Sequence, residues 1–374
     1  MYYIEKCKLV PFLFIILSGG KADRDVAVII GGSDNMGKDI MEIYDMNQNT
    51  PCDDFHWLPP FPVPQRFAAG AFVESVGIVV CGGVHVISGQ EEDRCFTLSK
   101  RSSVWKVNSP GAIVSADMVV PYPHGSQNSY WMIPNKFFFT NLTFFKSPAN
   151  DFWMDGVPLP HKIKDHCSTK VEFGGITQYY VIGGTDHNVE NHRTWVYCKE
   201  YNAKMCPKGN GKEWVWGRPD LTVDIAYFRQ HTCTSFKDQM YGKTIVVAGG
   251  IGMDIYALLH VETCVLTGTR CFWIHRDTPP DMSNLIFTKM TNINEQPVLF
   301  GGLTFNGTYS SKVWVLELET FMRPNVYVWK PIHHLKSPRG GHVAIAVPRS
   351  FVCNNFTTSV PRSTAQLSDG KVLQ

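Results

Sequence analysis

The residues best suited to chemistry are a few histidines with an acidic neighbour, and eleven cysteines. Asp186, His187 and His192 gather within one short segment, which would suit a divalent metal, and His333 stands beside His334. Solvated polar loops explain both groups more simply. The chain contains no G-x-S-x-G, H-E-x-x-H or P-loop motif and no C-x-x-C. We therefore predict no catalytic, cofactor or metal site, and we expect a protein that is not an enzyme.

The charge of the chain argues against another class of function. Of its 374 residues, 18% are charged, the formal net charge is +2, and no long basic or acidic run occurs. Because nucleic-acid binding needs a concentrated cationic face, we expect no nucleic-acid partner. The 31 glycines and 23 prolines are spread along the whole chain, which is typical of many short strands joined by tight turns.

The N-terminus has the pattern of a secretory signal peptide. Lys6 and Lys8 precede nine apolar residues, 9–17, and the small residues Ser18, Gly19 and Gly20 follow. Nine residues are too few to cross a bilayer, which needs about 20. A buried N-terminal strand is the alternative. We predict cleavage near residue 20, no transmembrane segment, and a secreted, extracellular protein.

The cysteines and the glycosylation motifs agree with export. Removal of the leader would take away Cys7 and leave ten of the eleven cysteines, an even number. Three N-x-S/T sequons begin at Asn141, Asn306 and Asn355. We expect a monomeric, disulfide-bonded glycoprotein, although a reduced, buried side chain is the alternative for every cysteine.

Short apolar strands that end in two glycines recur along the chain. The intervals between their first glycines are 51, 101, 66 and 52 residues, and 101 is about two periods. A further unit is therefore expected near residue 132, where residues 130–133 read as a strand without the glycines. Six units of about 50 residues are typical of a propeller. The pairs are Gly31 and Gly32, Gly82 and Gly83, Gly183 and Gly184, Gly249 and Gly250, and Gly301 and Gly302.

Each unit holds the elements of four short strands. We take the first glycine of each pair, or residue 132 in the third unit, as the marker of its unit. A β-rich segment, such as residues 312–318, follows each marker, and an apolar strand, such as residues 67–73, precedes it. A tryptophan lies 21 to 33 residues after each marker. Any one tryptophan would fit ordinary core packing, but one per unit indicates a repeat. Four strands make one propeller blade. The tryptophans are Trp57, Trp105, Trp153, Trp216, Trp273 and Trp329.

This order, an apolar strand ending in Gly-Gly, an aromatic strand and a tryptophan, resembles the kelch repeat over about residues 25–350. The resemblance implies an all-β, six-bladed propeller with four-stranded antiparallel blades. The third unit departs from it by lacking the glycines, and the fourth by an insertion around residues 202–212. We expect a signal peptide over 1–20, the propeller over 25–353 and a disordered polar tail over 354–374, without a BTB or F-box adaptor domain.

The two ends of the repeat predict how the ring closes. The first unit begins at its second strand, residues 26–32, and has no inner strand of its own. Residues 342–347 have the inner-strand pattern, but no further unit follows them. We therefore predict that the last strand completes the first blade and removes the open sheet edges. Kelch propellers commonly close in this way.

The cysteines are placed on this frame. A bond between Cys52 and Cys353 would lock the closure, while Cys167 and Cys233 occupy equivalent inner-strand positions. The latter two either bridge neighbouring blades or remain buried thiols, and spacing does not choose between these states. Three further pairs join neighbouring strands of one blade: Cys81 with Cys95, Cys198 with Cys206, and Cys264 with Cys271.

The loops between strands two and three and between strands four and one share one face, because strand direction alternates. We expect this face to bind a partner through side chains that suit protein interfaces. Variable loops without function are the alternative. Asn306 lies in the same set, so a glycan there would shield part of the face. The candidate residues are His85, Asp186, His187, His192, Tyr256, Phe305 and Arg339.

Three functional hypotheses follow. The first is a module that binds an extracellular protein or glycan through its blade loops. The second is a secreted propeller enzyme that acts on carbohydrate, which would need convergent titratable residues at the channel mouth. The third is a matrix component assembled through intermolecular disulfides.

Overall fold

The computed structural model describes the greater part of the repeat region. The described residues are 24–33, 41–46, 58–74, 76–90, 92, 94–100, 102–108, 116–121, 130–134, 144–146, 153–155, 159–160, 163, 165–173, 176–186, 189–190, 194–199, 214–217, 220–221, 230–239, 242–251, 261–267, 270–276, 278, 285–319 and 326–352. The predicted leader and C-terminal tail lie outside these residues, so both stay predictions.

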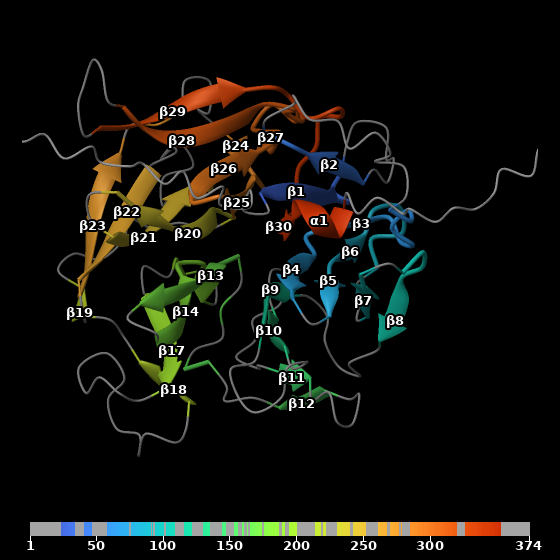
Figure 1. Ribbon diagram of the computed structural model, residues 1–374, viewed down its shortest axis with the longest axis horizontal. Helices are drawn as coiled ribbons and strands as arrows, with labels where there is room; N and C mark the ends of the chain where they lie inside the picture. Colours follow the sequence, from blue (N-terminus) through green and yellow to red (C-terminus); the bar gives the residue numbers. More distant parts are fainter. Residues whose placement is uncertain are drawn as a thin grey trace, which may run out of the picture.

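Five sheets each contain four antiparallel strands in chain order (Figure 1). The third lacks the glycine pair but forms a complete sheet, as the repeat predicts. In the fifth unit, β19 (Asp220–Leu221) adds a parallel strand at the outer edge. The strands are β4 (Ala69–Val73), β5 (Gly77–Cys81), β7 (Cys95–Leu98) and β8 (Lys106–Asn108); β9 (Ala116–Pro121), β10 (Tyr130–Pro134), β11 (Phe144–Lys146) and β12 (Trp153–Asp155); β13 (Cys167–Phe173), β14 (Ile176–Ile182), β17 (Thr194–Lys199) and β18 (Trp214–Gly217); β20 (Thr232–Asp238), β21 (Gly242–Ala248), β22 (Val261–Thr267) and β23 (Arg270–Arg276); and β25 (Lys289–Ile293), β26 (Gln296–Phe300), β28 (Val313–Glu319) and β29 (Val326–Ile332).

A further sheet has three strands, in the order β2 (Glu42–Tyr44), β1 (Asp25–Ile30) and β30 (Val343–Pro348). The sequence predicts six four-stranded blades, whereas the described residues contain five. Residues 47–57, where the sequence predicts a fourth strand of the first blade, lie outside the described residues. β30 pairs with β1 along its whole length, from Val343 opposite Ile30 to Pro348 opposite Asp25.

The innermost strands of the sheets surround a common centre (Figure 1). β30 contacts β4, β4 contacts β9, and β9 contacts β13. β13 contacts β20, β20 contacts β25, and β25 contacts β30. Side chains from adjacent sheets fill the space between them, as Tyr180 and Val196 do against Ile245 and Val247. The architecture is that of a β-propeller, in which each sheet buries both faces against its neighbours.

The glycine pairs lie where the second strand of each unit ends, and all ten glycines adopt positive φ angles. At Gly83 a side chain would also meet the backbone, because a Cβ atom there would lie 2.7 Å from the carbonyl oxygen of Arg66. The glycine pair therefore permits a turn and a close backbone approach at which any other residue would be strained.

The described tryptophans of the outer strands pack inward: Trp216 lies 4.8 Å from Tyr197 between ring centroids, and Trp329 is buried.

Three short ribbons extend the loops at one end of the sheets. They pair β3 (Gln65–Arg66) with β6 (Val84–His85), β15 (Thr185–Asp186) with β16 (Val189–Glu190), and β24 (Leu285–Ile286) with β27 (Leu303–Thr304). A short helix, α1 (Arg349–Val352), follows β30. Within the described part of the chain, no helix has the length and apolar character needed to span a bilayer.

Candidate functional site

One end of the central channel is bordered by a belt of residues that immediately precede the inner strands. These residues are Phe67, Asp165, Gln230, Phe287 and Gly341, and all five adopt positive φ angles. The amide of Phe67 donates to the carbonyl of Gly341 at 2.6 Å, and the amide of Gly341 donates to Phe287 at 2.9 Å. The amide of Gln230 donates to Asp165 at 3.0 Å. Hydrogen bonds between sheets therefore hold four non-glycine residues in a conformation that L-amino acids disfavour.

Beneath this belt the channel contains a cavity of about 180 Å³. One wall is apolar and is made of residues 68–70 and 343–344. The opposite wall is polar and is made of residues 166–170, 231–234 and 289–291, including two histidines and two lysines. This site has no signal in the sequence, because lining residues from five strands converge only when the sheets are packed around a common centre.

The loops above the belt are tied to one another across different sheets. The amide of Gly32 donates to the carbonyl of Gln65 at 2.9 Å, and the amide of Gly302 donates to Arg339 at 2.8 Å. Ser33 and Gly340 exchange two backbone hydrogen bonds, at 2.9 and 3.1 Å. We call this set of loops, residues 31–33, 58–66, 84–90, 303–312 and 333–341, the loop face. Its backbone is fixed by bonds between segments far apart in the sequence.

Arg339 lies in the interior, although the sequence suggests an exposed residue of a binding loop. Its side chain is 2% exposed, and its Nη2 lies 3.1 Å from the Glu42 Oε2 atom, which is also buried. The Nη1 atom donates to the carbonyl of Gly31 at 3.3 Å, and the amide of Lys336 donates to Glu42 Oε1 at 3.2 Å. Burial raises the pKa of the Glu42 carboxyl, and the Arg339 charge opposes part of that rise. The prediction for Arg339 as an exposed anchor is therefore wrong, since the residue braces the loop face from beneath.

The remaining candidates of the binding face are placed in part. Phe305 is 44% exposed, and the Nδ1 atom of His85 accepts a hydrogen bond from the amide of Ser88 at 3.1 Å. Ile87, which the sequence did not single out, is 79% exposed in the loop after β6. The backbone of Asp186 lies in β15, and its side chain is outside the described part. His187, His192 and Tyr256 lie outside the described residues.

The paired histidines near the C-terminus have structural contacts. The ring of His333 stacks on Tyr44, with 4.1 Å between ring centroids, and the Tyr44 hydroxyl donates to the His333 carbonyl at 2.6 Å. The Nδ1 atom of His334 lies 3.2 Å from Ser311 Oγ. Among the residues that the structure describes, no group of three or more histidine, cysteine, aspartate or glutamate side chains is arranged to hold a metal ion.

The sequon at Asn306 occupies an exposed turn of the loop face. The amide of Gly307 donates to the carbonyl of Thr304 at 2.9 Å, and Thr304 Oγ1 donates to the carbonyl of Thr308 at 2.9 Å. Asn306 Oδ1 accepts a hydrogen bond from the amide of Thr308 at 3.3 Å, and Asn306 is adjacent to Phe305. Asn141 and Asn355 lie outside the described residues, so glycosylation of all three sequons stays a prediction.

One predicted disulfide pair is present, and a second bond joins two cysteines whose state the sequence left undecided. Cys81 and Cys95 are bonded across β5 and β7, where they face each other in the ladder. Cys167 and Cys233 are bonded between β13 and β20, so they bridge neighbouring blades. Cys198 and Cys264 are also disulfide-bonded. The proposed partners Cys206 and Cys271, and the pair Cys52 and Cys353, lie outside the described side chains, so those pairings stay predictions.

An ion pair in the loop before β7 predicts a pH dependence. Glu92 is 7% exposed and accepts from Arg94 Nε and Nη2, both at 2.5 Å. Burial alone would raise the pKa of Glu92, but the Arg94 hydrogen bonds and charge lower it below its usual range. A lowered folded-state pKa gives stability above the unfolded value of about 4.3, which is lost as pH falls through the folded value.

We therefore expect Glu92→Gln to lower the free energy of unfolding by about 1–2 kcal/mol at pH 7. The difference from the unchanged protein should begin to shrink as pH falls below about 4.3 and should disappear below the folded-state pKa of Glu92. Denaturant unfolding at a series of pH values measures it, with exposed Glu74→Gln as the control. A loss that stays constant from pH 7 to pH 3 would rule out this ion pair as its source.

The comparisons with known proteins bear on the fold. No protein-family model matches the chain, and no curated protein matches it. Among solved structures, 194 chains match. The structure of YjhT is similar over 78% of this chain and 88% of that chain, with 12% sequence identity and a TM-score of 0.52. The shared fold is a β-propeller. At this identity the likeness extends to the fold alone and carries no activity to the present chain.

Proposed function

We propose that this protein is an exported interaction module that binds another extracellular protein through its loop face. The observation that carries the proposal is the combination of a cross-braced backbone with exposed apolar side chains on the same loops. Phe305 and Ile87 are 44% and 79% exposed, and both lie in loops between the second and third strands of a sheet. Scattered exposed apolar residues are common, but aromatic and aliphatic side chains on fixed loops suit a binding surface.

The bracing supports binding because it lowers the entropy lost on association. Loops that are already held by hydrogen bonds need little ordering when a partner arrives. The loop at 335–339 is fixed from two directions: Leu335 donates to the Ser311 carbonyl at 2.8 Å, and Arg339 donates to Ser310 at 3.0 Å. The buried Arg339–Glu42 pair then supports the same loop from below. We infer that the loop face is presented in its binding conformation.

A glycan at Asn306 would divide this surface. Since Asn306 is exposed beside Phe305, a sugar there would lie at the edge formed by residues 303–311. The partner would then contact mainly the other edge, near Ile87 and His85. The expected binding surface therefore lies toward the Ile87 edge, reaches Phe305 at its border and does not cover the whole face.

Export is supported by the disulfide bonds. Disulfides persist in oxidising compartments, and the two described pairs join strands in the interior of the propeller. These bonds are compatible with an extracellular protein. The leader, the cleavage site and the glycans remain parts of the proposal.

We further propose that the chain is a kelch-type propeller with six blades and that β30 closes its ring. The pairing of β30 with β1 supports closure, and so do the inner-strand contacts from β30 to β4 and to β25. After β30, Phe351 of α1 is buried and lies 5.1 Å from Phe72 of β4 between ring centroids. The repeated glycines and tryptophans support the kelch family, and a fourth strand within residues 47–57 would complete the first blade.

The proposed function is tested by binding of labelled protein to cell surfaces. Multivalent protein secreted from a eukaryotic host is applied to a panel of cell lines, and binding is measured by flow cytometry over a concentration series. We expect Ile87→Ser with Phe305→Ser to weaken binding at least tenfold, since buried apolar anchors dominate interfaces. The matched control is Val104→Ser with Val107→Ser, which changes two other exposed apolar residues, on the β7–β8 hairpin and β8.

Equal weakening by both double variants would indicate non-specific hydrophobic adsorption to cells and would contradict specific binding through the loop face. Binding that survives the loop-face changes but is lost with the control would place the partner at the outer edge of the sheet. Covalent oligomers on a non-reducing gel would favour a matrix component. The Asn306→Gln variant, which removes the sequon, should strengthen binding if a glycan shields part of the loop face.

A further inference from the structure

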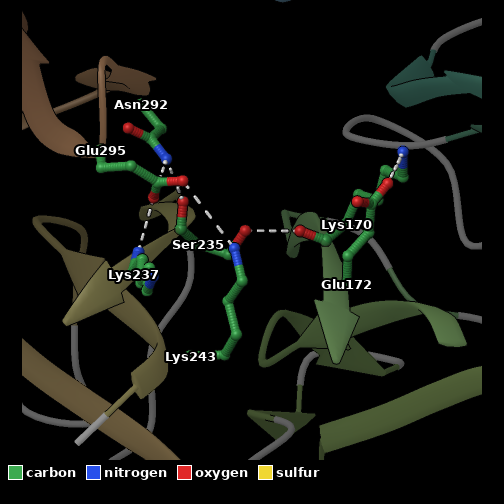
Figure 2. Close-up of polar contacts among 7 residues, drawn as sticks. All are labelled: Lys170, Glu172, Ser235, Lys237, Lys243, Asn292 and Glu295. Atoms are coloured by element: carbon green, nitrogen blue, oxygen red, sulfur yellow. Dashed lines mark hydrogen bonds and ion pairs between the residues drawn. The ribbon is translucent and has the colours of Figure 1, made fainter. Parts of the chain in front are cut away.

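At the end of the channel opposite the belt, polar contacts join three neighbouring sheets. Figure 2 shows Ser235 between Lys170 on one side and Asn292 with Glu295 on the other. The Ser235 hydroxyl donates to the carbonyl of Lys170 at 2.5 Å, and Asn292 Nδ2 donates to the Ser235 carbonyl at 2.8 Å. Glu295 Oε2 accepts from the amide of Lys237 at 2.6 Å. The channel wall from β13 through β20 to β25 is thereby fixed in place.

Cationic side chains outnumber carboxylates in this network. Lys170 Nζ lies 2.5 Å from Glu172 Oε1, and Lys243 Nζ lies 3.9 Å from Glu295 Oε1. Lys243 also contributes to lowering the pKa of Glu172, after the larger effect of the Lys170 hydrogen bond and charge. The seven residues of Figure 2 comprise three lysines and two glutamates, so their net charge is +1.

Lys289 of the adjoining cavity wall adds a further cation. The cavity is lined by Lys170 and Lys289 from two different strands, and no carboxylate occurs among the described residues that line it. Both glutamates of Figure 2 are at least half exposed, at 61% and 51%, and neither belongs to the cavity lining. Lys170 and Lys289 thus bring two cationic side chains to the described walls of the cavity, and low-dielectric walls strengthen the attraction of such groups for an anion.

The polar wall also supplies hydrogen-bonding groups along the same strands. Thr169, Thr232, Thr234 and Thr291 line the cavity together with Ser168. Serine and threonine hydroxyls donate to oxyanions, and hydrogen bonds to charged acceptors are stronger than those between neutral groups. Hydroxyls beside two lysines are the donor set that a carboxylate, sulfate or phosphate group needs.

We propose that the central channel binds a small oxyanion, a free molecule that carries a carboxylate, sulfate or phosphate group, between β13, β20 and β25. The size of the cavity limits the ligand, since about 180 Å³ corresponds to roughly a dozen water molecules. The apolar wall is closely packed: a Cβ atom at Gly70 would lie 2.5 Å from Val343 Cγ1. The ligand's anionic group therefore faces the lysine wall, and any hydrocarbon part faces residues 68–70 and 343–344. This site is independent of the loop face.

The test uses the full disulfide-bonded protein and sodium sulfate, phosphate, acetate and succinate as probes. Isothermal titration calorimetry is performed at constant ionic strength in chloride, so that screening is matched. We expect at least one oxyanion to bind with one site per chain. Lys289→Met, and separately Lys170→Met, should weaken that binding about tenfold or more through loss of a charged donor. Lys330→Met is the matched control, because Lys330 lies on the outer strand β29, away from the cavity, and pairs with Glu317 of β28.

Thermal unfolding in chloride buffer, without any probe anion, establishes that each variant is folded before its affinity is compared. Crystals soaked in selenate give a position that does not depend on any variant, and the anomalous peak should lie between Lys170 and Lys289. Preference for sulfate or phosphate would identify a tetrahedral ligand, and preference for acetate or succinate a carboxylate. Absence of binding by all four probes, equal weakening by Lys330→Met, or an anomalous peak outside the channel would overturn the proposal.

Discussion

Replacing Cys167 and Cys233 together with alanine should lower the free energy of unfolding by about 4 kcal/mol. The bond joins β13 to β20 across a sequence separation of 66 residues, so its loss frees a long loop in the unfolded chain. In the folded protein the two cysteines lie at the boundary between neighbouring sheets, where the Ser235 hydroxyl also donates a hydrogen bond to the Lys170 carbonyl. Denaturant unfolding without reductant measures the change.

The pair Cys81 and Cys95 provides the matched control. Their alanine double variant removes the same atoms, but their separation is 14 residues and both lie within one sheet. The chain-entropy relation gives about 3 kcal/mol for this pair, so the inter-blade bond should contribute more. A larger loss for Cys81 and Cys95 than for Cys167 and Cys233 would show that local packing, rather than the covalent link between blades, determines the contribution.

Arg339→Met should lower the free energy of unfolding by about 3–5 kcal/mol at pH 7, because it leaves the buried Glu42 carboxylate without its cation. Both side chains are nearly inaccessible, at 2% and 3% exposure. The double variant Arg339→Met with Glu42→Met removes both charges, and replacement of a buried pair by apolar side chains is often neutral. We expect the double variant to recover most of the loss, as measured by denaturant unfolding.

The pH dependence of the Arg339→Met variant provides a second readout. Burial already raises the pKa of Glu42, and removal of the Arg339 charge should raise it further. A carboxyl whose folded-state pKa is raised stabilises the fold below the unfolded value of about 4.3, and that stability is lost as pH rises through the folded value. The deficit of the variant should therefore be largest at neutral pH and should shrink toward pH 4. A deficit that grows on acidification would contradict a buried, unpaired Glu42.

The sequence predicted the propeller because its repeated residues have local roles. Glycine pairs such as Gly82 and Gly83 are needed where a strand ends in positive φ, so their period marks the second strand of each unit. Tryptophans such as Trp216 and Trp329 pack from the outer strands. Even the unit without glycines was located, since β10 occupies the position that the period requires.

Features that depend on contacts between units were not predictable in the same way. Phe67, Asp165, Gln230 and Phe287 share a positive φ angle but comprise three residue types, so the belt has no sequence signal. Arg339 reads as an exposed loop residue, because Glu42, its partner, is 297 positions away. The bond between Cys167 and Cys233 likewise required the distance between two blades, which the spacing of cysteines does not contain.

The most direct test of the central claim, an exported and disulfide-bonded propeller, is the intact mass of protein secreted from a eukaryotic host. The mass is measured without reductant, before and after glycosidase treatment. Eleven cysteines less Cys7 leave ten, so we expect five disulfides, the loss of about 20 N-terminal residues and a mass decrease on removal of glycans. Retention of Met1 with free thiols and no glycan would contradict export, and the disulfide-stabilised extracellular module proposed for this chain would then be wrong.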